Sequence, residues 1–286
     1  MKQILAVLVF SSSVAAAQGL TPLPPESQTG GFAIGCQAYT FNRFSVVEAI
    51  DKTAAAGGKV IEFYPGQKLS PTEPTVVFNH DASDEVVAKV KAKLGEAGLR
   101  AVNYGVVEVP ADEPGARKVF DFAKKLGLRS ITTESTGSLD TIEKLVKEYG
   151  IGCGIHNHPR RPNDPSYKVW DPAYILEIVK GRDARIGAAA DTGHWTRSGI
   201  KPVDALRLLE GRVVSVHLKD LNVFGQREAH DVPFGTGVGD VPAVLDELRR
   251  QAFGGNISIE YEYNWESSVP EVAQCIGFVR GYGARK

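Results

Sequence analysis

Short runs of apolar residues recur along the chain from residue 32 onward, and each precedes a stretch with apolar residues three and four positions apart. The runs cover residues 32–36, 60–63, 101–107, 130–134, 152–156, 186–191, 213–217 and 257–260. The amphipathic stretches cover residues 45–56, 83–97, 113–126, 139–149, 172–180, 202–209, 241–251 and 270–282. Runs without polar alternation are typical of strands buried on both faces. Eight strand–helix units therefore predict an α/β fold, a closed parallel (β/α)8 TIM barrel.

Residues that favour helix ends support this division. Ser83, Asp171 and Asp240 stand where helix N-caps are expected. Glycines that can adopt the left-handed conformation follow most predicted helices, namely Gly57-Gly58, Gly98, Gly127, Gly150 and Gly254-Gly255. The alternative is an open doubly wound sheet, which is disfavoured because no G-x-G-x-x-G follows a strand.

Two longer insertions interrupt the regular alternation, at residues 65–81 and 221–239. Both follow predicted strands, so in a barrel both extend from the end where the active site lies. They are candidates for a lid or for substrate contacts. For the first insertion, an ordinary surface excursion is an equal alternative.

The amino-terminal segment has the features of an export signal. Met1-Lys2-Gln3 precedes a short apolar stretch at residues 4–10, and Ala15-Ala16-Ala17 provides an A-x-A cleavage site. We predict a signal peptide at residues 1–17, an extended Pro-rich leader at residues 18–30 and a single catalytic TIM-barrel domain at residues 31–286. The protein is then exported, to the periplasm or the medium, and soluble after cleavage.

Charge and cysteine content exclude some classes of partner. Lys and Arg number 33 against 34 Asp and Glu, without a basic stripe, which disfavours nucleic acid and anionic membranes. Cys36, Cys153 and Cys275 are widely spaced within apolar runs, so we expect core residues rather than disulfides. A small-molecule partner is the expectation, and a homo-oligomer is left open.

Polar residues collect at the ends of the predicted strands. Ordered by strand from the second to the eighth, they are Glu62; Asn103 and Tyr104; Glu134; His156, Asn157 and His158; Asp191 and His194; His217, Lys219 and Asp220; Glu260 and Glu262. In a barrel these ends surround one cavity. Imidazoles facing carboxylates suit one divalent ion such as Mn, Co, Zn, Fe or Mg. The alternative for Asp191 is a helix N-cap, and the alternative for Lys219 is a surface pair with Asp220.

The order and spacing of these motifs resemble the xylose-isomerase-like sugar isomerase/epimerase superfamily. The motifs are Asp191-x-x-His194, His217-x-Lys219-Asp220, Phe234-Gly235-x-Gly237-x-Gly239-Asp240 and Glu260. The superfamily includes tagatose/psicose 3-epimerases, hydroxypyruvate isomerase, inosose dehydratase and endonuclease IV barrels. The resemblance implies that Asp191, His217 and Glu260 bind the metal and that His194 contacts substrate.

The fifth strand departs from that pattern. Epimerases of the superfamily generally carry a Glu there, as ligand and as one of two bases, whereas this chain has Ile155-His156-Asn157-His158. His156 still serves as the fourth ligand in our assignment, and Glu134 or Glu260 serves as the base. His158, His194 and Lys219 orient or protonate substrate oxygens. The predicted substrate contacts are Glu62, Tyr104, His194, Trp195, Arg227 and Trp265.

The resulting hypothesis is a metal-dependent isomerase/epimerase that acts on a non-phosphorylated keto-sugar through a metal-stabilised enediolate. Free sugar is expected because no Gly-rich loop or Arg cluster marks a phosphate site in the sequence. The first alternative is a lyase or dehydratase eliminating across C1–C2 of a 3-keto-glycoside. The second is a non-catalytic periplasmic sugar-binding protein. A nuclease on the same barrel is disfavoured by the near-neutral charge.

Overall fold

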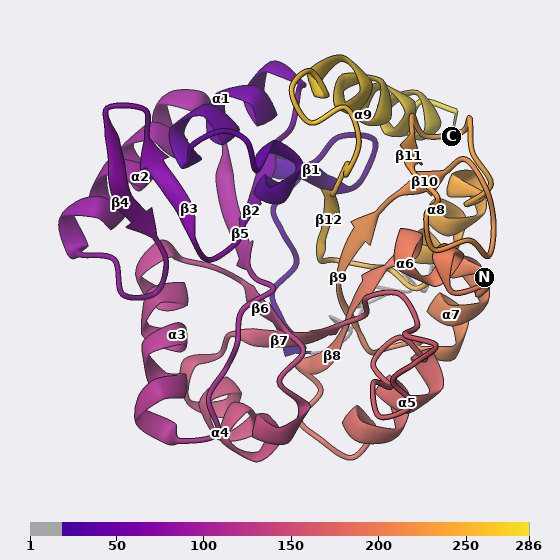
Figure 1. Cartoon of the computed structure of the whole chain (residues 1–286), viewed down its shortest axis with the longest axis horizontal. Coiled ribbons are helices and arrows are strands. Elements are labelled where there is room, and N and C mark those ends of the chain that lie inside the picture. Colours follow the sequence, from indigo (N-terminus) through magenta and orange to yellow (C-terminus); the bar gives the residue numbers. More distant parts are fainter. Residues whose placement is uncertain (1–18, 286) are drawn as a thin grey trace, which may run out of the picture.

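Eight parallel strands close into a barrel in the computed structural model, which describes residues 19–285. β1 pairs with both β2 and β12, so the ring has no free edge. Figure 1 shows the helices outside this ring. The barrel confirms the predicted fold class and excludes the open sheet. Its strands are β1 (Ala33–Gln37), β2 (Val60–Phe63), β5 (Arg100–Tyr104), β6 (Ser130–Thr133), β7 (Gly152–His156), β8 (Ile186–Asp191), β9 (Val213–Leu218) and β12 (Asn256–Ile259).

The predicted helices are all present, with ends within one or two residues of the expected positions. They are α1 (Val46–Ala55), α2 (Asp84–Ala97), α3 (Glu113–Leu126), α4 (Leu139–Tyr149), α5 (Pro172–Val179), α7 (Pro202–Leu208), α8 (Val241–Arg250) and α9 (Val269–Gly283). The side chains of Ser83, Asp171 and Asp240 cap helices as predicted. Left-handed Gly98, Gly127 and Gly150 end helices as predicted.

The structure differs from the sequence predictions in two local features. After α8 the left-handed residue is Ala252, with φ of 50°, and not Gly254 or Gly255. The apolar periodicity also did not predict α6 (Thr192–Arg197), which starts directly after β8, and only the alternative of Asp191 as a helix N-cap implied it. A six-residue helix is too short to show a periodic apolar pattern.

The leader packs against the barrel, and the predicted signal peptide at residues 1–17 lies outside the described residues. Leu20 and Leu23 are buried, and the Leu23 N–H donates to the Gly254 carbonyl at 3.1 Å. Arg129, just before β6, donates Nε–H to the Thr21 carbonyl at 3.0 Å. The leader thus covers amino-terminal strand ends, opposite the end that carries the site.

The first insertion forms a hairpin of β3 (Gln67–Ser70) and β4 (Glu73–Phe78) that lies beside α1 (Figure 1). Its Phe78 is fully buried, with ring centroids 5.2 Å from Phe63 and 5.3 Å from Phe122. Phe78 therefore anchors the hairpin in the core, which fixes the position of this insertion. Only its start, at Pro65, lines a cavity at the mouth.

The second insertion contains a short hairpin of β10 (Asp220–Leu221) and β11 (Asp231–Val232). The Asp220 carboxylate accepts from the backbone N–H groups of Gly235, Gly237 and Gly239 at 2.9, 3.0 and 2.8 Å. A Cβ on Gly237 would lie 2.4 Å from Asp220 Oδ1. The backbone of the glycine-rich motif therefore surrounds the Asp220 carboxylate. These hydrogen bonds fix the conformation of the loop after β9.

The remaining sequence predictions about the core also hold. Cys36, Cys153 and Cys275 are free and buried, as expected. No helix within residues 19–285 has the length and hydropathy needed to cross a membrane.

A polar layer crosses the barrel interior below the mouth. Asn103 donates to the hydroxyls of Thr132 at 2.7 Å and Ser215 at 3.3 Å. The Ser258 hydroxyl donates to Glu62 Oε2 at 2.7 Å. All five side chains belong to buried residues, so hydrogen bonding stabilises this layer. It supports the charged groups above it.

Candidate metal centre

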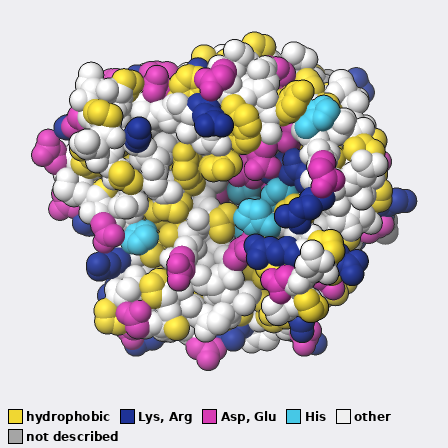
Figure 2. Space-filling model, viewed as in Figure 1, with side chains coloured by type: hydrophobic (Ala, Val, Ile, Leu, Met, Phe, Trp, Pro, Cys, Tyr) yellow, Lys and Arg dark blue, Asp and Glu magenta, His cyan; other side chains and the backbone are white. Residues whose placement is uncertain are grey.

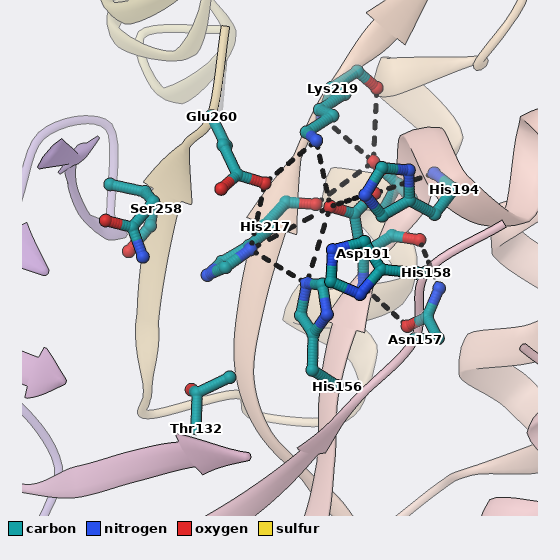
Figure 3. Close-up of polar contacts among 12 residues, drawn as sticks. Thr132, His156, Asn157, His158, Asp191, His194, His217, Lys219, Ser258 and Glu260 are labelled. Carbon is teal, nitrogen blue, oxygen red and sulfur yellow. Dashed lines mark hydrogen bonds and ion pairs between the residues drawn. The ribbon is translucent and has the colours of Figure 1, made fainter. Parts of the chain in front are cut away.

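The carboxyl ends of β7, β8, β9 and β12 bring charged and imidazole side chains together at the barrel mouth. Figure 2 shows His side chains in the central hollow, next to acidic and basic ones. In Figure 3, His156, Asp191, His217, Lys219 and Glu260 point toward one another from these ends. The structure thus brings together all four predicted metal ligands.

Asp191 performs both roles that its position suggests. Oδ1 accepts from the His194 N–H at 2.7 Å and caps α6, while Oδ2 is buried without a hydrogen-bond partner. Asn157 holds the Asp191 backbone through two hydrogen bonds, each of 2.9 Å. The carboxylate is therefore fixed, and its second oxygen has an ion-pair contact with Lys219 Nζ at 3.2 Å but no hydrogen bond.

His217 lies between two carboxylates. Its Nε2 is 3.1 Å from Glu62 Oε1, and its Nδ1 is 3.3 Å from Glu260 Oε2 and 3.8 Å from Asp191 Oδ2. Burial lowers the pKa of His217, but Glu62 and Glu260 outweigh this and hold it well above its ordinary value. Because Nε2 faces Glu62 in an ion-pair contact, Nδ1 is the nitrogen that can bind a metal, as in the carboxylate–histidine–metal arrangement of many metalloproteins. Metal binding there would release the Nδ1 proton.

His156 supplies a second inward-facing nitrogen. Its Nε2 is 3.2 Å from His217 Nδ1 and 3.7 Å from Asp191 Oδ2, while Nδ1 faces Glu134 Oε1 at 3.6 Å. If Nδ1–H points to Glu134, the lone pairs of the two imidazoles face each other. That arrangement requires a proton or a cation between them.

The donor spacing tests whether a metal fits. Ligand distances of about 2.0–2.2 Å in a tetrahedron place neighbouring donors about 3.3–3.6 Å apart. Four donor pairs among His156 Nε2, Asp191 Oδ2, His217 Nδ1 and Glu260 Oε2 are separated by 3.2, 3.3, 3.7 and 3.8 Å. Two nitrogens and two oxygens at this spacing fit one divalent ion of the Zn, Mn, Co or Fe type.

A different set of four, with His194 in place of His217, has donor atoms that all lie within 4.8 Å of one another. The partner of His194 argues against it as a ligand. Burial holds the pKa of His194 well below its ordinary value, so the ring is neutral, and Arg197 Nη1 donates to its Nδ1 at 3.0 Å. We infer that the proton is on Nε2, which makes that atom a donor.

Lys219 is a buried cation next to the predicted ligands, with a fully buried side chain. Its Nζ lies 3.2 Å from Asp191 Oδ2 and 2.8 Å from both Glu260 Oε2 and Glu262 Oε2. The alternative of a surface pair with Asp220 is therefore wrong, since Asp220 binds the glycine amides. Three carboxylates surround the ammonium, and Glu262 Oε2 accepts a hydrogen bond from it at 2.8 Å, so Lys219 neutralises acids rather than standing free.

A second cluster lies beside the first and shares His156. Glu134 Oε1 receives a short hydrogen bond from His158 Nδ1 and another from the Tyr167 hydroxyl at 3.0 Å. Glu134, His156 and His158 also form a set that can hold a metal. Burial raises the pKa of Glu134, but its bonds to His156 and His158 outweigh burial and keep the carboxyl ionised. Glu134 is partly exposed, with 23% of its side chain accessible, unlike Asp191.

Three predicted substrate contacts are buried away from the mouth, so the structure contradicts them. Glu62 is fully buried under His217, and its second oxygen accepts from Ser258. Tyr104 is fully buried, and its hydroxyl contacts His80 Nδ1 at 3.2 Å. Trp195 is fully buried because α6 begins at Asp191 and turns the indole into the core.

The other predicted contacts lie near the mouth. Trp265 is half-buried, with its ring centroid 5.9 Å from that of Tyr39. Arg227 is exposed and donates to the Arg160 carbonyl at 3.0 Å. A cavity of about 260 Å³ lies over His158 and Glu260 and is also lined by residues that sequence reasoning missed, namely Gln37, Tyr39 and Tyr64. Gln37 ends β1, so the strand-end rule that identified the other residues also applies to it.

Two proteins of assigned function are similar in sequence. The chain is 24% identical over 205 residues to the rhizopine catabolism protein MocC of Rhizobium meliloti, covering 66% of this chain but only 60% of that protein. It is 22% identical over 264 residues to 3-oxo-isoapionate decarboxylase of Pectobacterium atrosepticum, covering 85% of this chain and 90% of that one.

Solved structures show the same fold. A protein from Parabacteroides distasonis superposes with a TM-score of 0.70 at 32% identity, covering 88% of this chain and 99% of that chain. The 3-keto-D-glucoside 4-epimerase YcjR of E. coli superposes with a TM-score of 0.66 at 14% identity, covering 87% and 99%. Residues 50–278 match the xylose isomerase-like TIM barrel family, and the chain belongs to this family.

Proposed function

We propose that the protein is a divalent-metal-dependent enzyme that isomerises or epimerises a keto-sugar. The observation that carries the proposal is the convergence of His156 Nε2, Asp191 Oδ2, His217 Nδ1 and Glu260 Oε2, each from a different strand end, with separations of 3.2, 3.3, 3.7 and 3.8 Å between four of the atom pairs. The 3-keto-D-glucoside 4-epimerase among the structural neighbours supports a keto-sugar as the class of substrate.

A metal held by these residues would polarise a ketone oxygen and make the neighbouring C–H group more acidic. The residues of the chain prepare the position. Glu62 fixes the orientation of His217, and Asn157 fixes the backbone of Asp191. Lys219 balances the charge of Glu260 and Glu262, whose carboxylates line the cavity.

Glu134 is the proposed base. It is ionised and partly exposed, and it contacts His158, which lines the cavity. The substrate C–H bond breaks and its proton moves to Glu134. The C–H electron pair forms a C=C bond to the ketone carbon, and the C=O π pair moves to the ketone oxygen, toward which His194 Nε2–H can donate. The His158 Nδ1–H group stays hydrogen-bonded to Glu134 Oε1 and keeps the carboxyl group oriented.

The carbon atom, and the face of that atom, to which the proton returns decide which reaction occurs. A two-base epimerisation needs a second carboxylate on the opposite face, and His156 occupies the strand end where the superfamily generally has that Glu. This substitution favours one-base chemistry. It supports isomerisation, or as second candidate a lyase that eliminates across C1–C2 of a 3-keto-glycoside. Export to the periplasm or medium remains our prediction from residues 1–17.

Proton exchange in D₂O tests the proposal. The protein is stripped with chelator, reloaded with Mn²⁺, Co²⁺ or Zn²⁺, and incubated with D-fructose, D-tagatose or a 3-keto-glucoside. We expect metal-dependent deuterium incorporation next to the carbonyl, or an eliminated product, by NMR. Absence of both with every loaded metal contradicts catalysis. Equal sugar binding by the stripped protein would instead support a non-catalytic binding protein.

A further inference from the structure

The loop between β7 and α5 carries two arginines beside the mouth. Arg160 and Arg161 follow two and three residues after His158. The Arg160 N–H donates to the Ser198 hydroxyl at the end of α6 at 2.9 Å, and Arg227 Nη1 donates to the Arg160 carbonyl at 3.0 Å. Loops after β7 and β9 therefore meet here. Figure 2 shows basic side chains next to the His side chains of the mouth. We call Arg160, Arg161 and Arg227 the cationic rim.

The rim guanidinium groups lack strong acidic partners. Within residues 19–285, no carboxylate lies within 4.0 Å of the guanidinium nitrogens of Arg160 or Arg227, and Arg161 reaches Asp164 only at 3.9 Å. Arg197, deeper in the site, differs, because it pairs with Asp231 at 3.4 Å and Glu262 at 3.1 Å. The rim therefore has N–H donors that the described protein does not use.

Aromatic rings hold two of these cations in place. The Arg160 guanidinium carbon lies 5.1 Å from the Trp170 ring centroid, and that of Arg161 lies 3.7 Å from the Tyr167 centroid. These four side chains line one cavity of about 480 Å³. Stacking on a ring orients a guanidinium and leaves its edge free for a bidentate bond to an anion.

The acids of this cavity are mostly engaged elsewhere. Asp171 accepts from the Ala173 N–H at 2.9 Å as the cap of α5, and Asp164 accepts from the Ser166 N–H at 3.2 Å. Glu177, on α5, also lines the cavity and is exposed.

Tyr167 connects the cavity with the proposed base. Its ring lines the cavity, and its hydroxyl donates to Glu134 Oε1 at 3.0 Å. The Tyr167 hydroxyl contacts the carboxylate of Glu134, and two further carboxylates, Glu260 and Glu262, line the cavity over His158. An anionic group of a substrate is repelled there and attracted to the rim, so the rim would also orient the substrate.

We propose that the cationic rim binds an anionic group of the sugar substrate, a carboxylate or a phosphate, while the ketone faces the metal centre. This inference rests on the proposed function and specifies its substrate class. It replaces the expectation of a neutral sugar, which relied on the absence of an Arg cluster in the sequence. Positions 160, 161 and 227 come together only in the fold.

The test compares three matched ligands by calorimetry on the metal-loaded protein: neutral D-fructose, the carboxylate 5-keto-D-gluconate and D-fructose 6-phosphate. We expect one acid to bind at least about tenfold more tightly than D-fructose. The variant Arg160→Gln/Arg227→Gln loses this preference and keeps its affinity for D-fructose. The preferred acid distinguishes a carboxylate from a phosphate. The control Arg43→Gln/Lys201→Gln removes two exposed charges that line other cavities and keeps the preference.

Three results would contradict the proposal that the cationic rim binds an anionic group. They are equal affinity for all three ligands, no measurable binding of either acid, and equal loss of preference in the control variant. The proposed function fails by a different result, the absence of metal-dependent proton exchange with every neutral sugar and also with 5-keto-D-gluconate and D-fructose 6-phosphate. An intact preference for acids together with absent exchange would refute catalysis and retain the rim.

Discussion

The two clusters at the mouth share His156 and differ in burial. The side chains of the cluster around Asp191 are buried, and the side chains of Asp191, His217 and Lys219 are fully buried. Around Glu134 the side chains are partly open, with His158 43% and Glu134 23% exposed. Both clusters contain imidazoles and carboxylates, so composition alone does not distinguish them.

The two clusters differ in the neighbouring residues that contact their side chains. In the buried cluster, Glu62 takes the outer nitrogen of His217, and Asn157 fixes the backbone of Asp191, so lone pairs converge on one point. In the open cluster, His158 and Tyr167 donate to Glu134, and His158 lines the cavity. Converging lone pairs suit a metal, whereas a hydrogen-bonded carboxylate at a cavity suits proton transfer.

Glu134→Gln tests the open cluster and has the largest expected effect. Losing the base should slow substrate proton exchange by about 10²–10⁴-fold while the metal content stays unchanged. Exchange rates by NMR and elemental analysis measure the two quantities. Glu96→Gln, exposed on α2 and outside both clusters, is the matched control with normal activity. Loss of metal in Glu134→Gln would place Glu134 in the ligand set instead.

Asp191→Asn tests the buried cluster. The amide oxygen can still cap α6, but the charge at the second atom is lost, so metal affinity should fall by at least about 100-fold. Metal retained after gel filtration measures this effect. Asp171→Asn changes the cap of α5 away from the centre and should retain the metal. If both variants retain the metal equally, our ligand set is wrong.

Glu62→Gln tests the support behind His217. A neutral amide orients the imidazole less strongly, so we expect metal affinity to fall about 10–100-fold, with activity restored at saturating metal. Competition with a fluorescent chelator measures the affinity. Glu73→Gln, in the β3–β4 hairpin, is a control that should bind metal normally. An unchanged affinity would show that the 3.1 Å contact of Glu62 with His217 is incidental.

The pH dependence of the free energy of unfolding tests the charged groups around Asp231, which lies next to the buried cluster. Burial raises the pKa of Asp231 to about 7, although Lys219 and Arg197 oppose it. A carboxyl with a raised pKa in the folded state stabilises the protein while protonated, and this contribution is lost as the pH rises from about 4 to about 7. Relative to Asp231→Asn, the free energy of unfolding of the parent should therefore decrease over this interval. Parallel denaturation curves of the two proteins across the interval would contradict the raised pKa.

Sequence patterns predicted the architecture well because barrel strands are buried on both faces and read as apolar runs. The short α6 escaped this rule, and with it the direction of Trp195, because a helix starting at Asp191 points the indole inward. Tyr104 was misplaced for a related reason, since a side chain at a strand end can face either the mouth or the helix layer.

The sequence by itself determined the barrel and which strand ends carry His156, Asp191, His217 and Glu260, because parallel strands place their carboxyl ends at one end. Only the tertiary structure decided which nitrogen of His217 faces inward, that Lys219 pairs with Asp191 rather than Asp220, and that Tyr167 reaches Glu134. These outcomes depend on partners far apart in the chain, and local periodicity contains no information about which distant group fills a hydrogen bond.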